Sequence, residues 1–241
     1  MNYESIRSTY LKEVMMKKRA MRLCIGILLI ISCSFSVAAY EDVPEGCWYN
    51  DAVNFVTVQG WMTGISQTEF APELPVSRAM VATVFWRMAG APEKEYEYIP
   101  YADDLPEDLW YYQAANWAFP DLMTGYPIFQ EDPPVPTGIF YTFDGERDIT
   151  REQMAVVLYR WHSLQERDFT PPEEGILSVF PDREQISPWA MDAVGWCVQE
   201  GYLQGDGMQL NPQASLTRAE LATILLRYCS DPSLIIPSES A

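Results

Sequence analysis

The feature that most constrains this chain is a helix-start motif that occurs three times. Each copy has a Ser or Thr followed directly by an arginine and then by an apolar run with helical spacing. A hydroxyl side chain is a good N-cap, and Glu or Gln three positions later completes a capping box. The motif therefore predicts three helices that begin alike in a chain built from repeats. The caps and arginines are Ser77 and Arg78, Thr150 and Arg151, and Thr217 and Arg218.

The arginine of each motif falls on the first residue of its expected helix. A cation is unfavourable there, because the free N–H groups give a helix N-terminus positive character. Three copies of an unfavourable charge suggest a role other than folding. A second arginine lies further along each helix, at Arg87, Arg160 and Arg227. We expect this second set to be structural, since a cation near a helix C-terminus is favourable and bonds carbonyl groups.

A longer pattern surrounds each motif. An acidic turn opens each copy, then come a tryptophan, an alanine at helical spacing and a closing glycine. The separation of tryptophan from arginine agrees within one residue between the first and third copies. The second copy is longer because of a proline-rich insertion at 127–141, which predicts an extended surface loop. The tryptophans are Trp48, Trp110 and Trp189, and the closing glycines are Gly64, Gly125 and Gly205.

This pattern predicts three helix-loop-helix units followed by a tail. A two-helix unit buries little surface by itself, so the three units should pack against one another. We expect the aromatic residues of each first helix, including the tryptophans, to supply much of the shared core. The predicted segments are repeats at 40–99, 100–170 and 177–232 and a tail at 233–241.

The first 39 residues form a different kind of segment. A basic stretch, a short apolar run and small residues with A-x-A-like sites predict a secretory signal peptide over 1–39. The position of the basic stretch favours Met15 or Met16 as the start. Two alternatives remain open. One is a short membrane anchor, although the apolar run is short for a bilayer. The other is lipoprotein processing, which would place a lipid on Cys33.

The charge and the cysteine content of the chain argue against nucleic-acid binding, a disulfide framework and a metal site. The chain has 16 basic and 34 acidic residues and a net charge of −18, so it lacks the basic footprint that nucleic acid requires. Beyond residue 39 an odd number of cysteines remains, which does not make a disulfide framework. Cys197 and Cys229 either pair or act as small apolar side chains. The sequence has no CxxC motif and a single histidine, His162, so we expect no metal and no cofactor.

Together these elements resemble the S-layer homology (SLH) domain in three consecutive copies over 40–229. The third copy is the fullest match, with Thr-Arg-Ala-Glu at its helix start. The first copy departs at Ser77 and Met80, and the second at Glu152, Gln153 and its insertion. The resemblance implies an all-α fold, with three repeats packed as a pseudo-threefold trimer around a central helix bundle. It also implies a protein secreted to the cell wall or surface layer of a bacterium.

The resemblance further implies a function. SLH trimers are non-catalytic anchors that bind secondary cell-wall polysaccharide, often with pyruvylated sugars, in grooves between repeats. A guanidinium fork beside free N–H groups at a helix N-terminus suits such a carboxylate. The competing interpretations are a surface salt bridge for each arginine and a core position for each tryptophan. The implied ligand-binding residues are Arg78, Arg151 and Arg218, their caps Ser77, Thr150 and Thr217, and the stacking rings Trp48, Trp110 and Trp189.

Two other functions remain open. A wall hydrolase would use paired carboxylates, but the acidic pairs at 103–104 and 173–174 lie in turn or linker sequence and no nucleophile motif is present. A structural or protein-interaction component of the envelope could bind Ca²⁺ on its acidic face, although the sequence holds no EF-hand loop.

Overall fold

The structure, a computed structural model, describes residues 40–93, 104–124, 126–128, 140–167 and 169–231. These residues all belong to one packing unit, Ala38–Ala241. The predictions of a signal peptide over 1–39, of lipidation at Cys33 and of a tail at 233–241 lie outside the described residues and stay predictions. Within the described ranges, no helix combines the length and the apolar character needed to cross a membrane.

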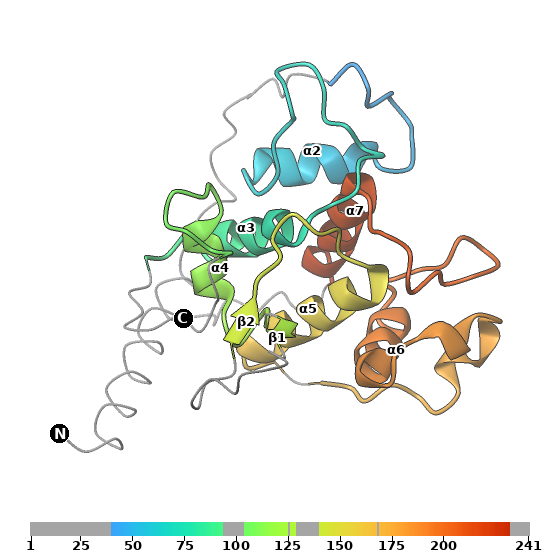
Figure 1. The fold of residues 1–241 in the computed structure, drawn as a ribbon. Coiled ribbons are helices and arrows are strands. Elements are labelled where there is room, and N and C mark those ends of the chain that lie inside the picture. Colours follow the sequence, from blue (N-terminus) through green and yellow to red (C-terminus); the bar gives the residue numbers. More distant parts are fainter. Residues whose placement is uncertain (1–39, 94–103, 125, 129–139, 168, 232–241) are drawn as a thin grey trace, which may run out of the picture. The chain divides into compact units, whose positions relative to one another are not determined.

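The described residues hold two α-helices in each repeat, as the sequence predicts (Figure 1). The second helix of each repeat begins at the arginine that follows the predicted cap. The chain is therefore helical, in agreement with the expected fold class. The helices are α2 (Asn50–Val58) and α3 (Arg78–Met88), α4 (Tyr112–Ala118) and α5 (Arg151–Leu164), and α6 (Met191–Gln199) and α7 (Arg218–Cys229).

Two short strands depart from an all-α fold. β1 (Tyr126–Ile128) and β2 (Phe140–Thr142) pair antiparallel, with Tyr126 opposite Thr142 and Ile128 opposite Phe140. They flank the proline-rich part of the insertion in the second repeat, so the base of the predicted loop is a hairpin. Three 3₁₀ turns precede α6: η1 (Ile176–Val179), η2 (Arg183–Gln185) and η3 (Pro188–Ala190).

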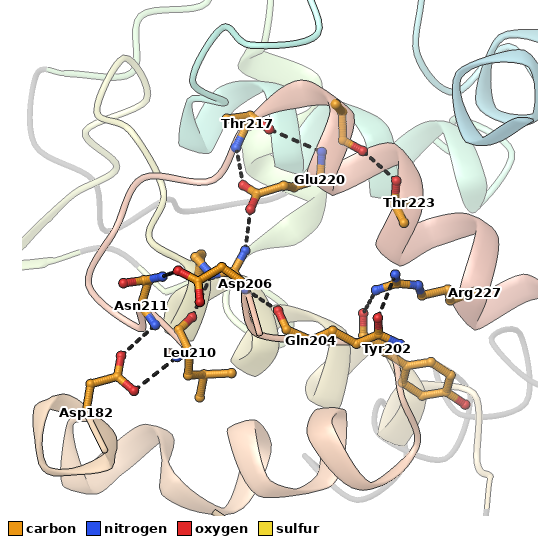
Figure 2. A network of polar contacts seen from close by, with 12 residues as sticks. Asp182, Tyr202, Gln204, Asp206, Leu210, Asn211, Thr217, Glu220, Thr223 and Arg227 are labelled. Atoms are coloured by element: carbon orange, nitrogen blue, oxygen red, sulfur yellow. Dashed lines mark hydrogen bonds and ion pairs between the residues drawn. The ribbon is translucent and has the colours of Figure 1, made fainter. Parts of the chain in front are cut away.

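The predicted N-caps are present in all three repeats. Thr217 accepts a hydrogen bond from the backbone of Glu220, whose side chain accepts one from the backbone of Thr217 in return (Figure 2). Thr150 and Gln153 form the same capping box. Ser77 accepts from the backbone of Met80, a residue whose side chain has no oxygen to complete the box. The caps explain why α3, α5 and α7 begin where they do.

The helices pack in cyclic order around the three repeats. The second helix of each repeat contacts the first helix of the next, so that α3 packs on α4, α5 on α6, and α7 on α2. Each repeat thus completes its apolar surface with a helix from its neighbour, and the core is shared as expected. The largest fully buried side chains include Phe70, Phe85, Phe143 and Trp196.

The prediction that the repeated tryptophans anchor this core is wrong. Trp48, Trp110 and Trp189 are 63%, 59% and 59% exposed. The physical reason is their position, because each tryptophan lies before its α-helix and not on the buried face of it. Trp48 precedes the N-cap of α2, whereas Ala52 inside that helix is 2% exposed.

A closed ring of backbone hydrogen bonds joins the segments that enter the second helices. The N–H of Val76 donates to the oxygen of Leu216 at 2.8 Å, that of Leu216 to Ile149 at 2.9 Å, and that of Ile149 back to Val76 at 2.9 Å. All three side chains have zero exposure. Each repeat therefore donates one hydrogen bond to one of the other two repeats and accepts one from the remaining repeat.

The cysteines of the described residues are free, so the alternative of a Cys197–Cys229 disulfide is wrong. Cys197 is 1% exposed, and its Sγ lies 3.7 Å from the carbonyl oxygen of Ala155. The other alternative, small apolar side chains in the interior, describes Cys197 well. The same region buries His162, which packs against the rings of Phe169 and Trp196.

Candidate functional site

The three repeated arginines lie buried between repeats. Arg218 of the third repeat is 7% exposed and donates from Nε to the oxygen of Phe70 at 2.8 Å and from Nη2 to the oxygen of Thr63 at 2.6 Å. Both carbonyls belong to the first repeat. The others follow the same rule in cyclic order: Arg78 donates to Phe143 and Thr124, both at 2.9 Å, and Arg151 donates to Leu210 at 2.9 Å and Gln204 at 2.6 Å.

The N–H groups beside these arginines are not free, which corrects the expected site geometry. In α7 the N–H of Arg218 donates to Leu74 and that of Ala219 donates to Pro72, each at 2.9 Å. The N–H of Glu220 donates to the Thr217 hydroxyl at 3.2 Å. The first turns of α3 and α5 are satisfied in the same way. A loop of the neighbouring repeat thus occupies the place that an anion was expected to take, and Ser77, Thr150 and Thr217 act as caps.

The third guanidinium nitrogen distinguishes the arginines from one another. Nη1 of Arg151 forms an ion pair with Oε1 of Glu220 in the next repeat. The competing interpretation was a surface salt bridge, but the Arg151 side chain is only 9% exposed, so this ion pair is largely buried. Arg218 has no hydrogen bond from Nη1 to any residue that the structure describes. Burial lowers the pKa of Arg218, and the nearby Tyr40 and Asp42 act in the opposite direction. Whether these arginines also contact a sugar stays a prediction.

An aspartate in the acidic turn of each repeat has a structural role that the sequence did not reveal. Asp182 accepts from the N–H groups of Leu210 at 3.0 Å and Asn211 at 2.7 Å (Figure 2). Asp42 accepts in the same way from Phe70 at 2.8 Å and Ala71 at 2.6 Å. These carboxylates hold the loop whose carbonyls receive the arginine of another repeat. The signal available in the sequence was their recurrence ahead of each tryptophan.

The close approach of backbone explains the closing glycines. A Cβ on Gly205 would lie 2.4 Å from the oxygen of Gln209, and one on Gly64 would lie 2.5 Å from the oxygen of Ser66. Neither site has room for a side chain. Gly125 lies outside the described residues. These glycines follow the carbonyls that accept the arginine Nη2 groups, so they let the loop fold tightly enough to present those carbonyls.

The second arginine set is structural, as predicted. Nη1 of Arg227 lies 3.4 Å from the oxygen of Tyr202, and its Nη2 donates to the side chain of Gln204 at 2.9 Å (Figure 2). Arg87 donates to Trp61 at 3.2 Å, and Arg160 to Leu122 at 3.3 Å. Each bond joins the second helix of a repeat to the turn after its own first helix.

The repeated tryptophans present indole rings to solvent at corresponding positions of the three repeats. Trp48 packs edge-on against Tyr49 with ring centroids 5.1 Å apart, and Trp110 packs in the same way against Tyr111 at 5.2 Å. These indoles and the guanidinium groups take part in different contacts. In the second repeat Tyr111 also packs against Phe143, with ring centroids 5.9 Å apart, and the guanidinium carbon of Arg78 lies 5.3 Å from the centre of the Phe143 ring. The joint role of these residues in ligand binding stays a prediction.

The comparisons with known proteins agree with the repeat pattern. The family model for the S-layer homology domain matches residues 39–80 and 179–222. These two segments are similar to the S-layer homology domain and correspond to the first and third repeats. The middle repeat, with its insertion, is outside the matched segments, and its assignment to the family stays a prediction.

Curated relatives share much of the chain at modest identity. An endoglucanase of Bacillus sp. (strain KSM-635) is 26% identical over 86% of this chain, and the surface-layer 125 kDa protein of Lysinibacillus sphaericus is 28% identical over 80%. The cellulosome-anchoring protein of Acetivibrio thermocellus is 27% identical over 78%. The chain covers 22%, 15% and 38% of these relatives, so it corresponds to a part of each.

Proposed function

We propose that this chain is a non-catalytic module that anchors to the bacterial cell wall by binding an anionic, pyruvylated secondary wall polysaccharide. The S-layer homology segments and the surface-layer and cellulosome-anchoring relatives support a cell-wall anchoring module at the cell surface. The polysaccharide and the residues that bind it are the further content of the proposal.

The observation that carries the proposal is the exposure of one large indole at the same place in every repeat. Three tryptophans that are 59% to 63% exposed contribute little to the core, and exposed aromatic surface is typical of binding sites. Indole rings stack on the apolar faces of sugars. We therefore assign Trp48, Trp110 and Trp189 to sugar stacking and the inter-repeat arginines to the carboxylate of a pyruvyl ketal.

We also propose that the three repeats form a pseudo-threefold trimer. The cyclic packing of the helices supports this arrangement, as do the ring of hydrogen bonds through Val76, Ile149 and Leu216 and the arginine contacts, which follow one order. A trimer of this kind offers three related grooves, each made from two repeats.

A catalytic function is the weaker alternative. Some relatives are named as enzymes, among them the endoglucanase. In this chain, however, Asp42 and Asp182 are engaged with backbone N–H groups, and His162 is 4% exposed within an aromatic cluster. We expect no hydrolysis of purified cell walls in a zymogram, and a cleared band from the pure protein would contradict the assignment.

The test is retention on purified pyruvylated wall polysaccharide, compared with the same polysaccharide after mild acid removes the ketal. We expect retention on the first and much weaker retention on the second. No retention on either would refute the proposal. Trp48→Ala is the first variant to compare, because the side chain is 63% exposed and its loss leaves the core intact. Val58→Ala is the matched control, since Val58 is also 63% exposed and lies outside the proposed site.

A further inference from the structure

The three inter-repeat arginines differ in the residue that faces the third guanidinium nitrogen. Nη1 of Arg151 pairs with Glu220, the third residue of the second helix in the next repeat. The other contacts of the arginines follow one cyclic order. Arg78 contacts the second repeat and Arg218 the first, and the residues there at the sequence position of Glu220 are Gln153 and Met80.

These three side chains have different chemistry toward a cation. A carboxylate neutralises the guanidinium, an amide oxygen accepts a hydrogen bond without charge, and a thioether is only a weak acceptor. The charge of Arg151 is therefore already balanced within the protein. The charge of Arg218 is not balanced by an ion pair in the described part of the chain, where its carbonyl partners are neutral.

We infer that the third residue of each second helix decides which inter-repeat arginine receives an anionic ligand, and that Arg218, opposite Met80, is the receiving site. This inference rests on the proposed function, because it chooses among the three related grooves. Glu220 makes the groove of Arg151 self-neutralised, and Gln153 gives that of Arg78 an intermediate character.

The surroundings of Arg218 fit this role. Its side chain is 7% exposed, and two of its nitrogens are fixed by Phe70 and Thr63. The guanidinium is thereby held in one orientation with Nη1 left over. The nearby Asp42 uses both of its oxygens for the N–H groups of Phe70 and Ala71. A ligand carboxylate would supply the acceptor that Glu220 supplies to Arg151, as a strong charge-assisted hydrogen bond.

The test exchanges the deciding residues and leaves the arginines in place. Met80→Glu copies the third repeat into the first, and Met80→Gln is its uncharged control. Glu220→Gln removes the ion pair of Arg151. The new amide can keep the capping box, because Gln153 forms the same box with Thr150 in the second repeat. Binding is measured by titration calorimetry with purified pyruvylated wall polysaccharide. Thermal unfolding of each variant is measured alongside.

We expect Met80→Glu to weaken binding by about tenfold or more, the loss of one charge-assisted hydrogen bond, and Met80→Gln to weaken it less. Glu220→Gln should add binding capacity. Met80→Glu should not reduce thermal stability, because Glu at this position completes a capping box with Ser77. The stability measurement therefore separates lost binding from unfolding.

Two failures are distinguishable. If the unmodified chain does not bind the polysaccharide, the proposed function fails. If it binds, but Met80→Glu binds equally well or Glu220→Gln changes neither affinity nor capacity, the choice of groove is wrong. Should Met80→Glu unfold, the Glu220→Gln result decides alone, and unchanged binding in that variant overturns the inference.

Discussion

Replacing Arg218 with alanine should cost this protein a large share of its stability. The side chain donates to Phe70 and Thr63 at 2.8 and 2.6 Å, and its guanidinium carbon lies 4.5 Å from the centre of the Phe70 ring. Hydrogen bonds from charged groups contribute about 1.5–3 kcal/mol each. We expect Arg218→Ala to lower the free energy of unfolding by about 3–5 kcal/mol, against roughly 5–15 kcal/mol for a typical domain.

The measurement is urea denaturation followed by circular dichroism and by tryptophan fluorescence. Arg183→Ala is the matched control, because that side chain is 50% exposed and forms an ion pair with its sequence neighbour Glu184. A surface pair of this kind should contribute less than about 1 kcal/mol. A loss below about 1 kcal/mol for Arg218→Ala would refute the view that this arginine holds two repeats together. The expected loss also means that Arg→Ala variants test glycan binding poorly, since unfolding and lost contact give the same result.

Three further predictions follow from local geometry. Ala71 has a φ of 57°, in the left-handed region that Asn211 occupies in the third repeat. Asn tolerates this region better than Ala, so Ala71→Asn should raise the free energy of unfolding by up to about 1 kcal/mol. A thermal melt tests this, and a lower melting temperature would contradict it. Gly205→Ala should lower the free energy of unfolding by more than about 2 kcal/mol, because the new Cβ would lie 2.4 Å from the oxygen of Gln209. Gly46→Ala is the control and should lower it less, because Gly46 has a φ of 77° but open space around it. Burial raises the pKa of Cys229 from its ordinary value of 9.0 to about 12, so its contribution to stability is complete below pH 9.0 and is lost as the pH rises toward 12. Urea unfolding at about pH 8 and about pH 10.5 should show a smaller decline for Cys229→Ala than for the unmodified chain, and an equal decline would exclude this residue as a cause.

The repeat pattern was enough to predict the helices but not the faces that they bury. The capping residues fixed the starts of α3, α5 and α7, because a cap acts through bonds within a few residues of itself. The tryptophans were misplaced because periodicity places a residue on a helix face only if the helix includes it. Trp48 lies outside α2, and its exposure depends on where the helix begins.

Contacts between repeats could not be predicted from spacing alone. Glu152 departs from the alanine that the first and third repeats have at this position. In the structure its side chain is 2% exposed and accepts from both the N–H and the hydroxyl of Ser187, each at 2.8 Å. Ser187 lies in the next repeat. The departure is thus a contact specific to one interface, and finding it requires knowing which repeat follows which in space.

The inter-repeat arginines show why an unfavourable local charge need not indicate a ligand. A cation at a helix N-terminus costs typically 0.3–1 kcal/mol, as judged from isolated helices. In α7 that terminus meets the carbonyls of Leu74 and Pro72, and the guanidinium meets those of Phe70 and Thr63. One loop of the first repeat therefore turns the negative ends of several peptide dipoles toward both positive groups. The loop supplies acceptors to the helix N-terminus and to two guanidinium nitrogens, so folding accounts for these contacts of the arginine. Folding leaves one difference unexplained. Nη1 of Arg218 has no hydrogen-bond partner among the described residues, whereas Nη1 of Arg151 pairs with Glu220. The residue of the first repeat at the sequence position of Glu220 is Met80.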